Sequence, residues 1–433
     1  MDLIQVNNGS GHVFCPIRMD MCSTTMSNYC TLKLYNHPMA QPSIITHPSM
    51  TGDAGESSVR TYIDNTLTTL LHELSLSPSE GQPSVTLRRR TNPAGYKVNP
   101  QNGALEAIEP VVSYRTYSWP GNSAFEAWRF TIIVRILSVI DEAIRVGQLI
   151  SKRRVDPWDI YYIDPAYFRS QHVVDKIVDD LAYTIGVDRA ALNIEAAGKG
   201  LVTGPFILRR DSQIVLDARS SAQGGHQDTL IPRIQENDEI DIFGARWVLI
   251  IEKEAVFHRL ARNNYHMTAL AGKGILITGK GYPDICTRAF IRRLFDFASN
   301  SNRRPPPIYA LVDGDPDGIS IMSTYKYGSL AHLHENARLA VPGLKYLGIR
   351  ISDAVRVSDV SEGVLLSLTP RDRRKIHSML RNSPIWADDG PEPEWRVELQ
   401  RMLMLNVKAE IETIYERDGG LEAWIDRRMF RQA

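Results

Sequence analysis

The second half of the sequence alternates short apolar stretches with helical patterns, and this alternation constrains the fold more than any other feature. The patterns between the apolar stretches, such as YPDICTRAFIRRLFDFAS at 282–299, are helical. Apolar strands separated by helices are typical of a doubly wound, mainly parallel sheet. The sequence therefore predicts an α/β domain over residues 241–433. Its predicted strands include 246–252 (RWVLIIE), 274–279 (GILITG), 308–315 (IYALVDGD) and 345–351 (KYLGIRI).

Acidic residues stand at the ends of two of these strands. Glu252 ends the first strand, Asp313 ends the third, and Asp315 follows two residues later. The carboxyl ends of parallel strands are where such sheets bind ligands, so the three side chains converge if the two strands are neighbours. Crowded carboxylates repel one another and favour a bound cation, and Mg²⁺ is the natural one. The alternative is that Glu252 pairs with a Lys or Arg and that Asp315 and Asp317 cap the next helix; for Asp317 alone we favour the cap.

Two loop motifs in this region do not fit the families that they suggest. VDGDPDGISI, at 312–321, begins like a calcium loop, but the closing position holds Thr324, the fourth position holds Pro316, and a strand precedes it. GILITGK matches the spacing of a phosphate-binding loop, but Gly281 replaces the Ser or Thr that would bind magnesium, and ILIT is strand-like. The sequence therefore favours neither an EF-hand nor a P-loop, and it leaves open a role for Lys280 near a phosphate.

The first half has a different texture. Residues 1–56 are rich in Ser, Thr, Asn, Met and Pro without periodicity, which predicts disorder. Residues 57–119 read as an isolated amphipathic helix followed by a Pro- and Gly-rich linker, and 226–240 as a second linker. Residues 120–225 show three helical patterns and then short turn-rich strands, the element order of a winged helix.

Two adjacent tyrosines, Tyr161 and Tyr162, follow an extended segment in the predicted winged-helix domain. A phenol can attack phosphorus if a base or a cation favours the phenolate. The competing interpretation is that both rings pack in the core. Physical reasoning does not choose one of the two as a nucleophile; it indicates only that adjacent side chains point in different directions.

The sequence has 50 basic and 50 acidic residues, so its net charge gives no general attraction for nucleic acid. Any nucleic-acid-binding surface must therefore be a local basic patch. Basic runs occur at 88–90, 152–154 and 371–374. The four cysteines show no zinc spacing, which favours free thiols in a reducing compartment. The apolar segment FTIIVRILSVIDEAI contains three charged residues, so we expect a buried helix and no membrane partner.

Several longer motifs occur in one order along the chain and carry a resemblance to a known family. They are DIYY, KGLVTG, LIIEKEAVF, GKGYPDICTR, VDGDPDGI and YKYGS. The chain resembles the A subunit of topoisomerase VI and still more its meiotic relative, sporulation protein eleven, over roughly residues 120–433. The resemblance implies a winged-helix catalytic domain followed by a Toprim domain, a Rossmann-like fold with a mainly parallel sheet.

The resemblance also implies an activity and a site. The protein would be a type II topoisomerase-like transesterase, independent of ATP, that makes meiotic double-strand breaks and leaves 5′-phosphotyrosyl links. Tyr162 would be the nucleophile, and Glu252, Asp313 and Asp315 would hold Mg²⁺. Family members carry Lys-Arg directly before DIYY, whereas this chain has Trp158 at the Arg position, so that charge would have to come from Arg153 or Arg154.

The implied setting is the nucleus, on chromosomes and double-stranded DNA. The protein would act as a homodimer with a topoisomerase VI B-like partner and other meiotic break proteins. Two alternatives remain at this point. One is a topoisomerase VI A subunit that reseals its breaks, and the other is a catalytically silent DNA-binding scaffold.

Overall fold

The computed structural model places most of the chain beyond residue 52 and divides it into two compact units. The first comprises Met1–Arg90 and Val112–Glu195, and the second comprises Thr91–Val111 and Ala196–Ala433. The described residues are 53–77, 79–90, 95–108, 112–146, 150–151, 160–195, 198–219, 228–235, 237–242, 244–300, 305–358, 365–416 and 419–432. The segment 1–56, expected to be disordered, lies outside them except for its last four residues, which form the first turn of a helix.

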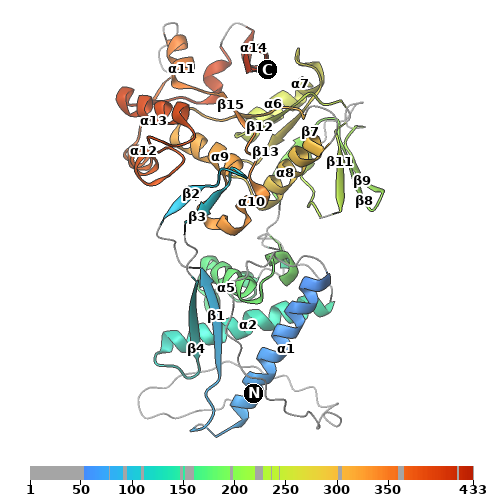
Figure 1. The fold of residues 1–433 in the computed structure, drawn as a ribbon, viewed down its shortest axis with the longest axis vertical. Coiled ribbons are helices and arrows are strands. Elements are labelled where there is room, and N and C mark those ends of the chain that lie inside the picture. The colour runs from blue at the N-terminus through green and yellow to red at the C-terminus, as the bar shows by residue number, and fades with distance from the viewer. Residues whose placement is uncertain are drawn as a thin grey trace. The chain divides into compact units, whose positions relative to one another are not determined.

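The first unit is built around a long apolar helix. Figure 1 shows this helix, α2, in the same unit as α1 and α5. Ten side chains of α2 are buried, including Ile133, Ile136 and Ile140, so the apolar segment noted in the sequence is a core helix, as predicted. No described helix is long and apolar enough to span a bilayer. The helices are α1 (Asp53–Ser75), α2 (Ala124–Val146), α3 (Ile160–Ile163), α4 (Pro165–Phe168), α5 (Gln171–Ile185) and the 3₁₀ helix η1 (Arg189–Leu192); the strands are β1 (Ser84–Arg90), β4 (Val112–Ser118), β5 (Ile150–Ser151) and β6 (Ile194–Glu195).

The prediction of an isolated helix and a linker over 57–119 is wrong. The helix α1 buries Val59, Ile63 and Leu70 in the core that it shares with α2. The supposed linker contains β1 and β4, which pair antiparallel along seven residues each. Their pairing spans sequence that is rich in turn residues, and a pattern read over short windows does not detect such a contact.

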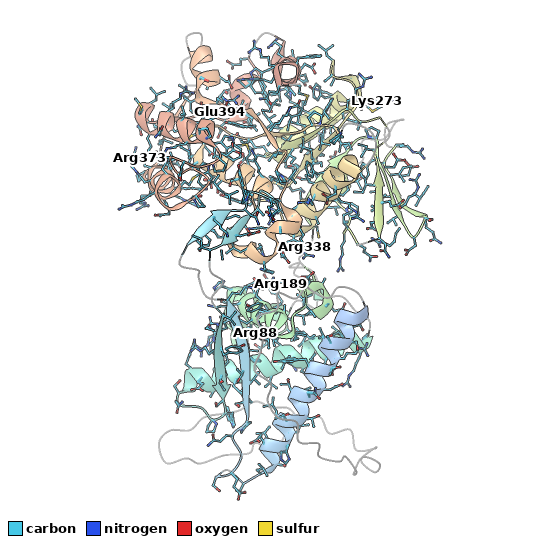
Figure 2. The ribbon with its side chains drawn as sticks, viewed as in Figure 1. Arg88, Arg189, Lys273, Arg338, Arg373 and Glu394 are labelled. Carbon is cyan, nitrogen blue, oxygen red and sulfur yellow. The ribbon has the colours of Figure 1, made fainter. Side chains whose placement is uncertain are left out.

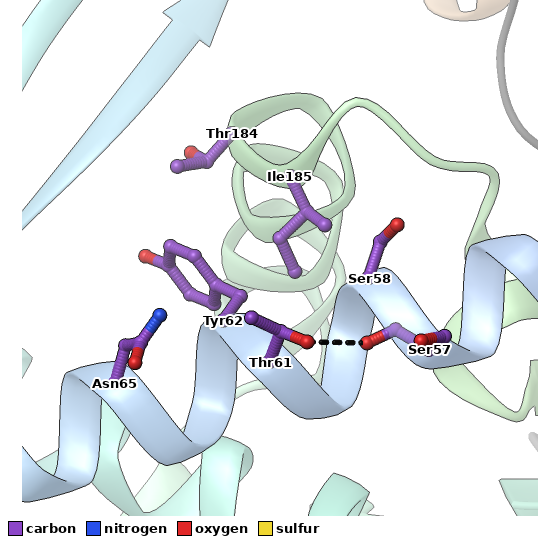
Figure 3. A pocket seen from close by; sticks show the side chains of 7 residues that line it. All are labelled: Ser57, Ser58, Thr61, Tyr62, Asn65, Thr184 and Ile185. Carbon is purple, nitrogen blue, oxygen red and sulfur yellow. Dashed lines mark hydrogen bonds between the residues drawn. The ribbon is translucent and has the colours of Figure 1, made fainter.

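A shallow hollow lies where α1 meets the end of α5. It has a volume of about 380 Å³, and its lining is mostly polar (Figure 3). Within it, the Thr61 hydroxyl donates to the Ser57 carbonyl oxygen at 2.9 Å, which is an ordinary bond back to the preceding helical turn. The residues that line the hollow are Ser57, Ser58, Thr61, Tyr62, Asn65, Thr184 and Ile185.

The second unit contains the predicted mainly parallel sheet. Six strands lie in the order β10-β7-β13-β12-β14-β15. Figure 1 labels four of them, β7, β12, β13 and β15. The pairs β12–β13, β12–β14 and β14–β15 are parallel, whereas β7 pairs antiparallel with both β13 and β10. The strands are β7 (Leu201–Thr203), β10 (Thr229–Leu230), β12 (Trp247–Ile251), β13 (Gly274–Thr278), β14 (Ile308–Leu311) and β15 (Lys345–Gly348).

Helices and short strands surround this sheet. The helices are α6 (Glu254–Arg262), α7 (Tyr265–Thr268), α8 (Ile285–Asn300), α9 (Pro316–Lys326), α10 (Asn336–Leu339), α11 (Ile351–Ser358), α12 (Pro370–Asn382), α13 (Pro393–Leu405) and α14 (Gly420–Gln432), with the 3₁₀ helices η3 (Leu330–Glu335) and η4 (Ile411–Ile414). The remaining strands are β2 (Tyr96–Val98), β3 (Leu105–Ala107), β8 (Ile207–Arg210), β9 (Gln213–Asp217), β11 (Asp238–Asp241), β16 (Leu366–Ser367) and β17 (Val407–Lys408). Every residue of β12, β13 and β14 is buried, as expected for strands covered on both faces.

The strands predicted as a wing at the end of the first domain belong to the second unit. The strand β7 extends the six-stranded sheet beside β13, and β8 and β9 form a separate sheet with β11. The domain boundary predicted at 225 therefore differs from the end of the first unit at Glu195. The predicted linker 226–240 is also wrong for its described part, because β10 and most of β11 lie there.

The packing of α1 predicts a contrast between two positions of the same helix. Ile63→Ala removes a fully buried side chain and should lower the free energy of unfolding by about 2–4 kcal/mol. Leu71→Ala, at a position that is 61% exposed, should change it little. Thermal and urea unfolding of the full-length protein measure the difference. Equal effects of the two substitutions would contradict the placement of α1 in the core.

Candidate active-site residues

The pairing of β12 with β14 brings the first two predicted acidic residues together. Ile251 and Leu311 are partners across the two parallel strands, so Glu252 and Asp313 follow at the same edge of the sheet. One carboxylate oxygen of Glu252 accepts a hydrogen bond from the Asp313 backbone N–H at 2.9 Å. The condition on which the sequence analysis based the convergence of the acids, that these strands are neighbours, is therefore met.

Asp315 caps the helix that follows. It is the N-cap residue of α9, and its side chain accepts from the Gly318 N–H at 2.7 Å. Asp317, for which we favoured a capping role, does not cap: its carboxylate pairs with Lys375 at 2.5 Å. The reason is register, because Pro316 is the first helical residue and the capping position directly precedes it.

The three carboxyl groups resist ionisation. Burial raises the pKa of Glu252 to about 8, and the neighbouring Asp313 and Asp315 add to the rise. Burial also raises the pKa of Asp313 to about 6, although Lys253 and the Ile411 N–H oppose it. The pKa of Asp315 is raised by burial as well, against the hydrogen bond from Gly318. A cation at this edge of the sheet would favour the ionised carboxylates and so offset these shifts.

Residues that the sequence analysis did not identify hold Asp313 in place. The Ile411 N–H donates to one oxygen of Asp313 at 2.8 Å, and the Lys253 ammonium lies 3.3 Å from the other. Lys253 also lies 2.6 Å from Glu412 and 3.4 Å from Glu410. Burial lowers the pKa of Lys253, but the three carboxylates raise it further than burial lowers it. No local signal identifies Glu410 or Glu412, because only the tertiary fold brings them to Lys253, about 160 positions earlier in the chain.

The donor set suits a hard divalent cation only in part. Each of the three acids accepts a backbone hydrogen bond with one oxygen, and the second oxygen of Asp313 also lies 3.3 Å from the Lys253 ammonium. Carboxylate oxygens are the ligands that Mg²⁺ takes, often one or two at a time with water completing its shell. Among the described residues, however, no three Asp, Glu, His or Cys side chains are arranged to hold one metal ion.

Near these acids lies the Gly-rich turn after β13. ILIT forms a strand, as predicted, and not a phosphate-binding loop. Lys280 has a φ of 53° in this turn, and its ammonium pairs with Glu254 at 2.8 Å. The Lys199 ammonium donates to the Lys280 carbonyl oxygen at 3.1 Å. Two lysines are thus fixed beside the carboxyl edge of the sheet.

The two tyrosines lie on α3 in the first unit and differ in exposure. Tyr161 packs against the core of that unit, whereas Tyr162 is 44% exposed. Their ring centroids are 5.1 Å apart at an interplanar angle of 73°. The expectation that the pair divides between core and solvent is therefore met, and Tyr162 is the accessible phenol. Arg153 and Arg154, the predicted charges beside it, lie outside the described residues.

Comparisons with known proteins match both units. A family model for the Toprim domain shared by the topoisomerase 6 A subunit/Spo11 proteins matches residues 247–421, which begin with the first residue of β12. A model described as "Type IIB DNA topoisomerase" matches residues 128–194, which end one residue before the first unit does.

The chain is also similar to named proteins over most of its length. It is 32% identical over 337 residues to meiotic recombination protein SPO11-1 of Arabidopsis thaliana, which covers 78% of this chain and 86% of the relative. It is 31% identical over 361 residues to the Homo sapiens meiotic recombination protein SPO11, covering 83% and 84%. The A subunit of Arabidopsis thaliana DNA topoisomerase 6 is 31% identical over 295 residues, covering 68% and 64%.

The raised carboxyl pKa values predict how stability varies with pH. Because the folded state holds protons more tightly than the unfolded state, metal-free protein should lose stability as pH rises from about 4.5 to 8, the window between the ordinary and the raised pKa of Glu252. Each such carboxyl contributes up to about 1.4 kcal/mol per pH unit. Thermal unfolding in the presence of a chelator measures this slope.

Glu252→Gln should flatten the slope and stabilise metal-free protein at pH 8. Glu254→Gln is the matched control, because that carboxyl has a lowered pKa, chiefly through its hydrogen bond to Lys280. It should leave the slope above pH 5 unchanged. If Glu252→Gln instead kept the wild-type slope, the acids at the sheet edge would not be its source.

Proposed function

We propose that this chain, which belongs to the family of topoisomerase VI A subunits and Spo11 proteins, cuts both strands of duplex DNA by tyrosine transesterification. Within that family it is a DNA-cleaving protein of the meiotic-recombination type. The observation that carries this proposal is the pairing of β12 with β14, which sets Glu252 and Asp313 side by side within the Toprim match. The accessible Tyr162 within the other match supplies the nucleophile.

In the proposed reaction, the Tyr162 phenolic oxygen attacks a backbone phosphorus. A bond forms between that oxygen and phosphorus, and the bond to the 3′ oxygen breaks. The phenol gives up its proton, and the leaving 3′ oxygen ends as a hydroxyl. One phosphodiester replaces another, so the bond energy is kept in the phosphotyrosyl link to the 5′ end and cleavage needs no ATP.

Glu252, Asp313 and Asp315 are the residues that would hold a divalent cation, and Mg²⁺ fits their oxygen donors best. When bound, the ion polarises the phosphate and stabilises charge on the leaving oxygen. The protein's part is to fix the carboxylates: the Ile411 N–H holds Asp313, and the Gly318 N–H holds Asp315. Lys253 balances this charge from one side. Arg153 and Arg154 are proposed to neutralise the phosphate beside Tyr162.

Breaking both strands requires two nucleophiles, which a twofold homodimer supplies with one sequence. We infer that the partners are duplex DNA, a second copy of the chain, a topoisomerase VI B-like protein and other meiotic break proteins, on chromosomes in the nucleus. Phosphate contacts would come from exposed basic side chains. Arg338, which Figure 2 labels in the second unit, is one such exposed side chain.

A topoisomerase that reseals its breaks is the second candidate. The similarity to the A subunit of DNA topoisomerase 6 favours it, at 31% identity. The match covers only 64% of that relative, against 86% of meiotic recombination protein SPO11-1, which favours the break-forming function. Relaxation of supercoiled DNA in the presence of a B-type subunit distinguishes the two, because only a resealing enzyme returns closed circles.

The assignment of the nucleophile predicts a difference between two adjacent tyrosines. Tyr162→Phe should abolish the covalent protein–DNA adduct while leaving folding and DNA binding intact, because only the phenolic oxygen is lost. Tyr161→Phe, which removes the same atom from the partly buried ring, should still form adducts. Denaturing gels of protein bound to end-labelled duplex measure the adduct. The reverse pattern would assign the reaction to Tyr161.

The proposed cation site predicts a difference between two aspartates near the start of α9. Asp313→Asn should lower adduct formation by more than about tenfold and raise the Mg²⁺ concentration needed for half-maximal yield. Asp317→Asn is the control, because Asp317 pairs with Lys375. It should retain near-normal yield and Mg²⁺ dependence. Unchanged cleavage by Asp313→Asn, or full cleavage in chelator, would refute the cation site.

A further inference from the structure

An aromatic surface at the start of α2 carries two guanidinium groups. The Arg169 Cζ lies 4.3 Å from the centroid of the Trp128 ring, and the Arg129 Cζ lies 5.2 Å from the same ring. Arg129 also lies 5.3 Å from the ring of Phe125, whose centroid is 5.4 Å from that of Trp128. We call Phe125, Trp128, Arg129 and Arg169 the arginine platform.

Hydrogen bonds join the platform to the chain that follows the nucleophile. The Trp128 indole N–H donates to the Tyr167 carbonyl oxygen at 2.9 Å, and the Tyr167 N–H donates to the Asp164 side chain at 3.0 Å. Asp164 is the residue between α3, which carries Tyr162, and α4. The indole ring is therefore fixed against the turn that continues from the catalytic helix.

Arg169 is exposed, and among the described residues it forms no ion pair. Its guanidinium carbon lies over the face of the Trp128 ring, in cation–π contact, while the residue remains exposed to solvent. The first turn of α5, which begins two residues later, contains no acidic residue. A stacked arginine keeps its charge and its planar set of donors, the form in which arginine binds phosphate.

The backbone at Arg169 is unfavourable for an arginine. Its φ is 62° and its ψ is −36°, a left-handed conformation that a side chain with a Cβ rarely adopts and that glycine adopts easily. A glycine would serve the α4–α5 turn better if the turn had only to fold. Backbone conformations of this kind persist at sites of function, so the arginine side chain needs a reason beyond the turn.

Arg169 lies near Tyr162 along the chain. Of the seven residue steps between them, four lie within the single turns of α3 and α4 and three lie outside. With consecutive Cα atoms 3.8 Å apart and the ends of the single turn α4 about 5 Å apart, the Cα atoms of Tyr162 and Arg169 are at most about 20 Å apart. A DNA strand advances 3.4 Å per nucleotide, so Arg169 can reach a phosphate within about six nucleotides of the one that Tyr162 attacks.

We propose that Arg169, stacked on Trp128, binds a DNA backbone phosphate beside the scissile position and so sets the duplex against Tyr162. This inference rests on the proposed function for the identity of the ligand. It assigns to this chain a phosphate contact on the C-terminal side of the nucleophile, whereas Arg153 and Arg154 precede the nucleophile by nine and eight residues. Arg129, which lies against the same Trp128 ring, adds positive potential to the contact.

The test is a salt series of DNA binding in the Tyr162→Phe background, with any partner subunits present. This background needs no cleavage, so the result is independent of whether the proposed chemistry is correct. Arg169→Gln should raise the concentration of a 40-base-pair duplex needed for half-saturation about tenfold. It should also reduce the slope of log affinity against log salt by about 0.9, the change expected for the loss of one phosphate contact. Arg169→Lys should restore most of the slope.

Arg145→Gln is the matched control. Arg145 is an exposed arginine paired with Asp141 near the end of α2, about 25 Å along the helix from Trp128. It should leave affinity and slope unchanged. With Tyr162 restored, Arg169→Gln should lower adduct yield at subsaturating DNA, and saturating DNA should recover most of the loss if positioning is its role.

Arg169→Gly separates binding from folding. It removes the guanidinium but suits the left-handed backbone, so it should unfold at a higher temperature than Arg169→Gln while showing the same loss of salt slope. If Arg169 served only to stabilise the fold by stacking on Trp128, both variants would bind DNA like the wild type. Wild-type affinity and slope in Arg169→Gln, or an equal loss in Arg145→Gln, would overturn the proposal.

Discussion

The parallel pairing of β12 with β14 is the contact on which the candidate site depends. It places Glu252 and Asp313 at one edge of a sheet whose strands are buried on both faces. This arrangement disfavours ionisation, because buried carboxyl groups that lie close together hold their protons to unusually high pH. A fold tolerates such a cluster when a cation or a paired base offsets it, and this chain supplies Lys253 on one side.

The segment after α13 acts as the second half of that site. Ala409 and Gly314 exchange two backbone hydrogen bonds, and the next residues bring the Ile411 N–H to Asp313 and the carboxylates of Glu410 and Glu412 to Lys253. The loop bearing Asp313 is thereby braced from a region about 100 residues away. A carboxylate fixed by a backbone donor keeps its orientation when its charge changes, which is what a cation ligand requires.

In the first unit, aromatic packing positions the candidate nucleophile. Tyr161 is inserted toward the core of the first unit, and this anchors α3 with Tyr162 facing outward. The following turn is tied by Asp164 and Trp128, so the exposed phenol and the exposed Arg169 are carried by one short, cross-linked stretch of chain. Each unit thus holds its own reactive groups rigidly, the phenol in one and the carboxylates in the other.

Local sequence patterns were sufficient to predict the strands and helices that hold the candidate site residues. Strand and helix periods reflect the faces that neighbouring residues bury, so the four apolar strands, the acids at their ends and the core helix α2 could be read from short windows. The tyrosine pair also followed, because adjacent side chains diverge. What the tertiary structure alone decided were contacts between distant segments: β1 with β4, β7 beside β13, Glu412 beside Lys253, and Arg169 over Trp128. Such pairings depend on how the whole chain closes its core and not on any local period, and this is why the supposed linker and wing proved to be parts of folded units.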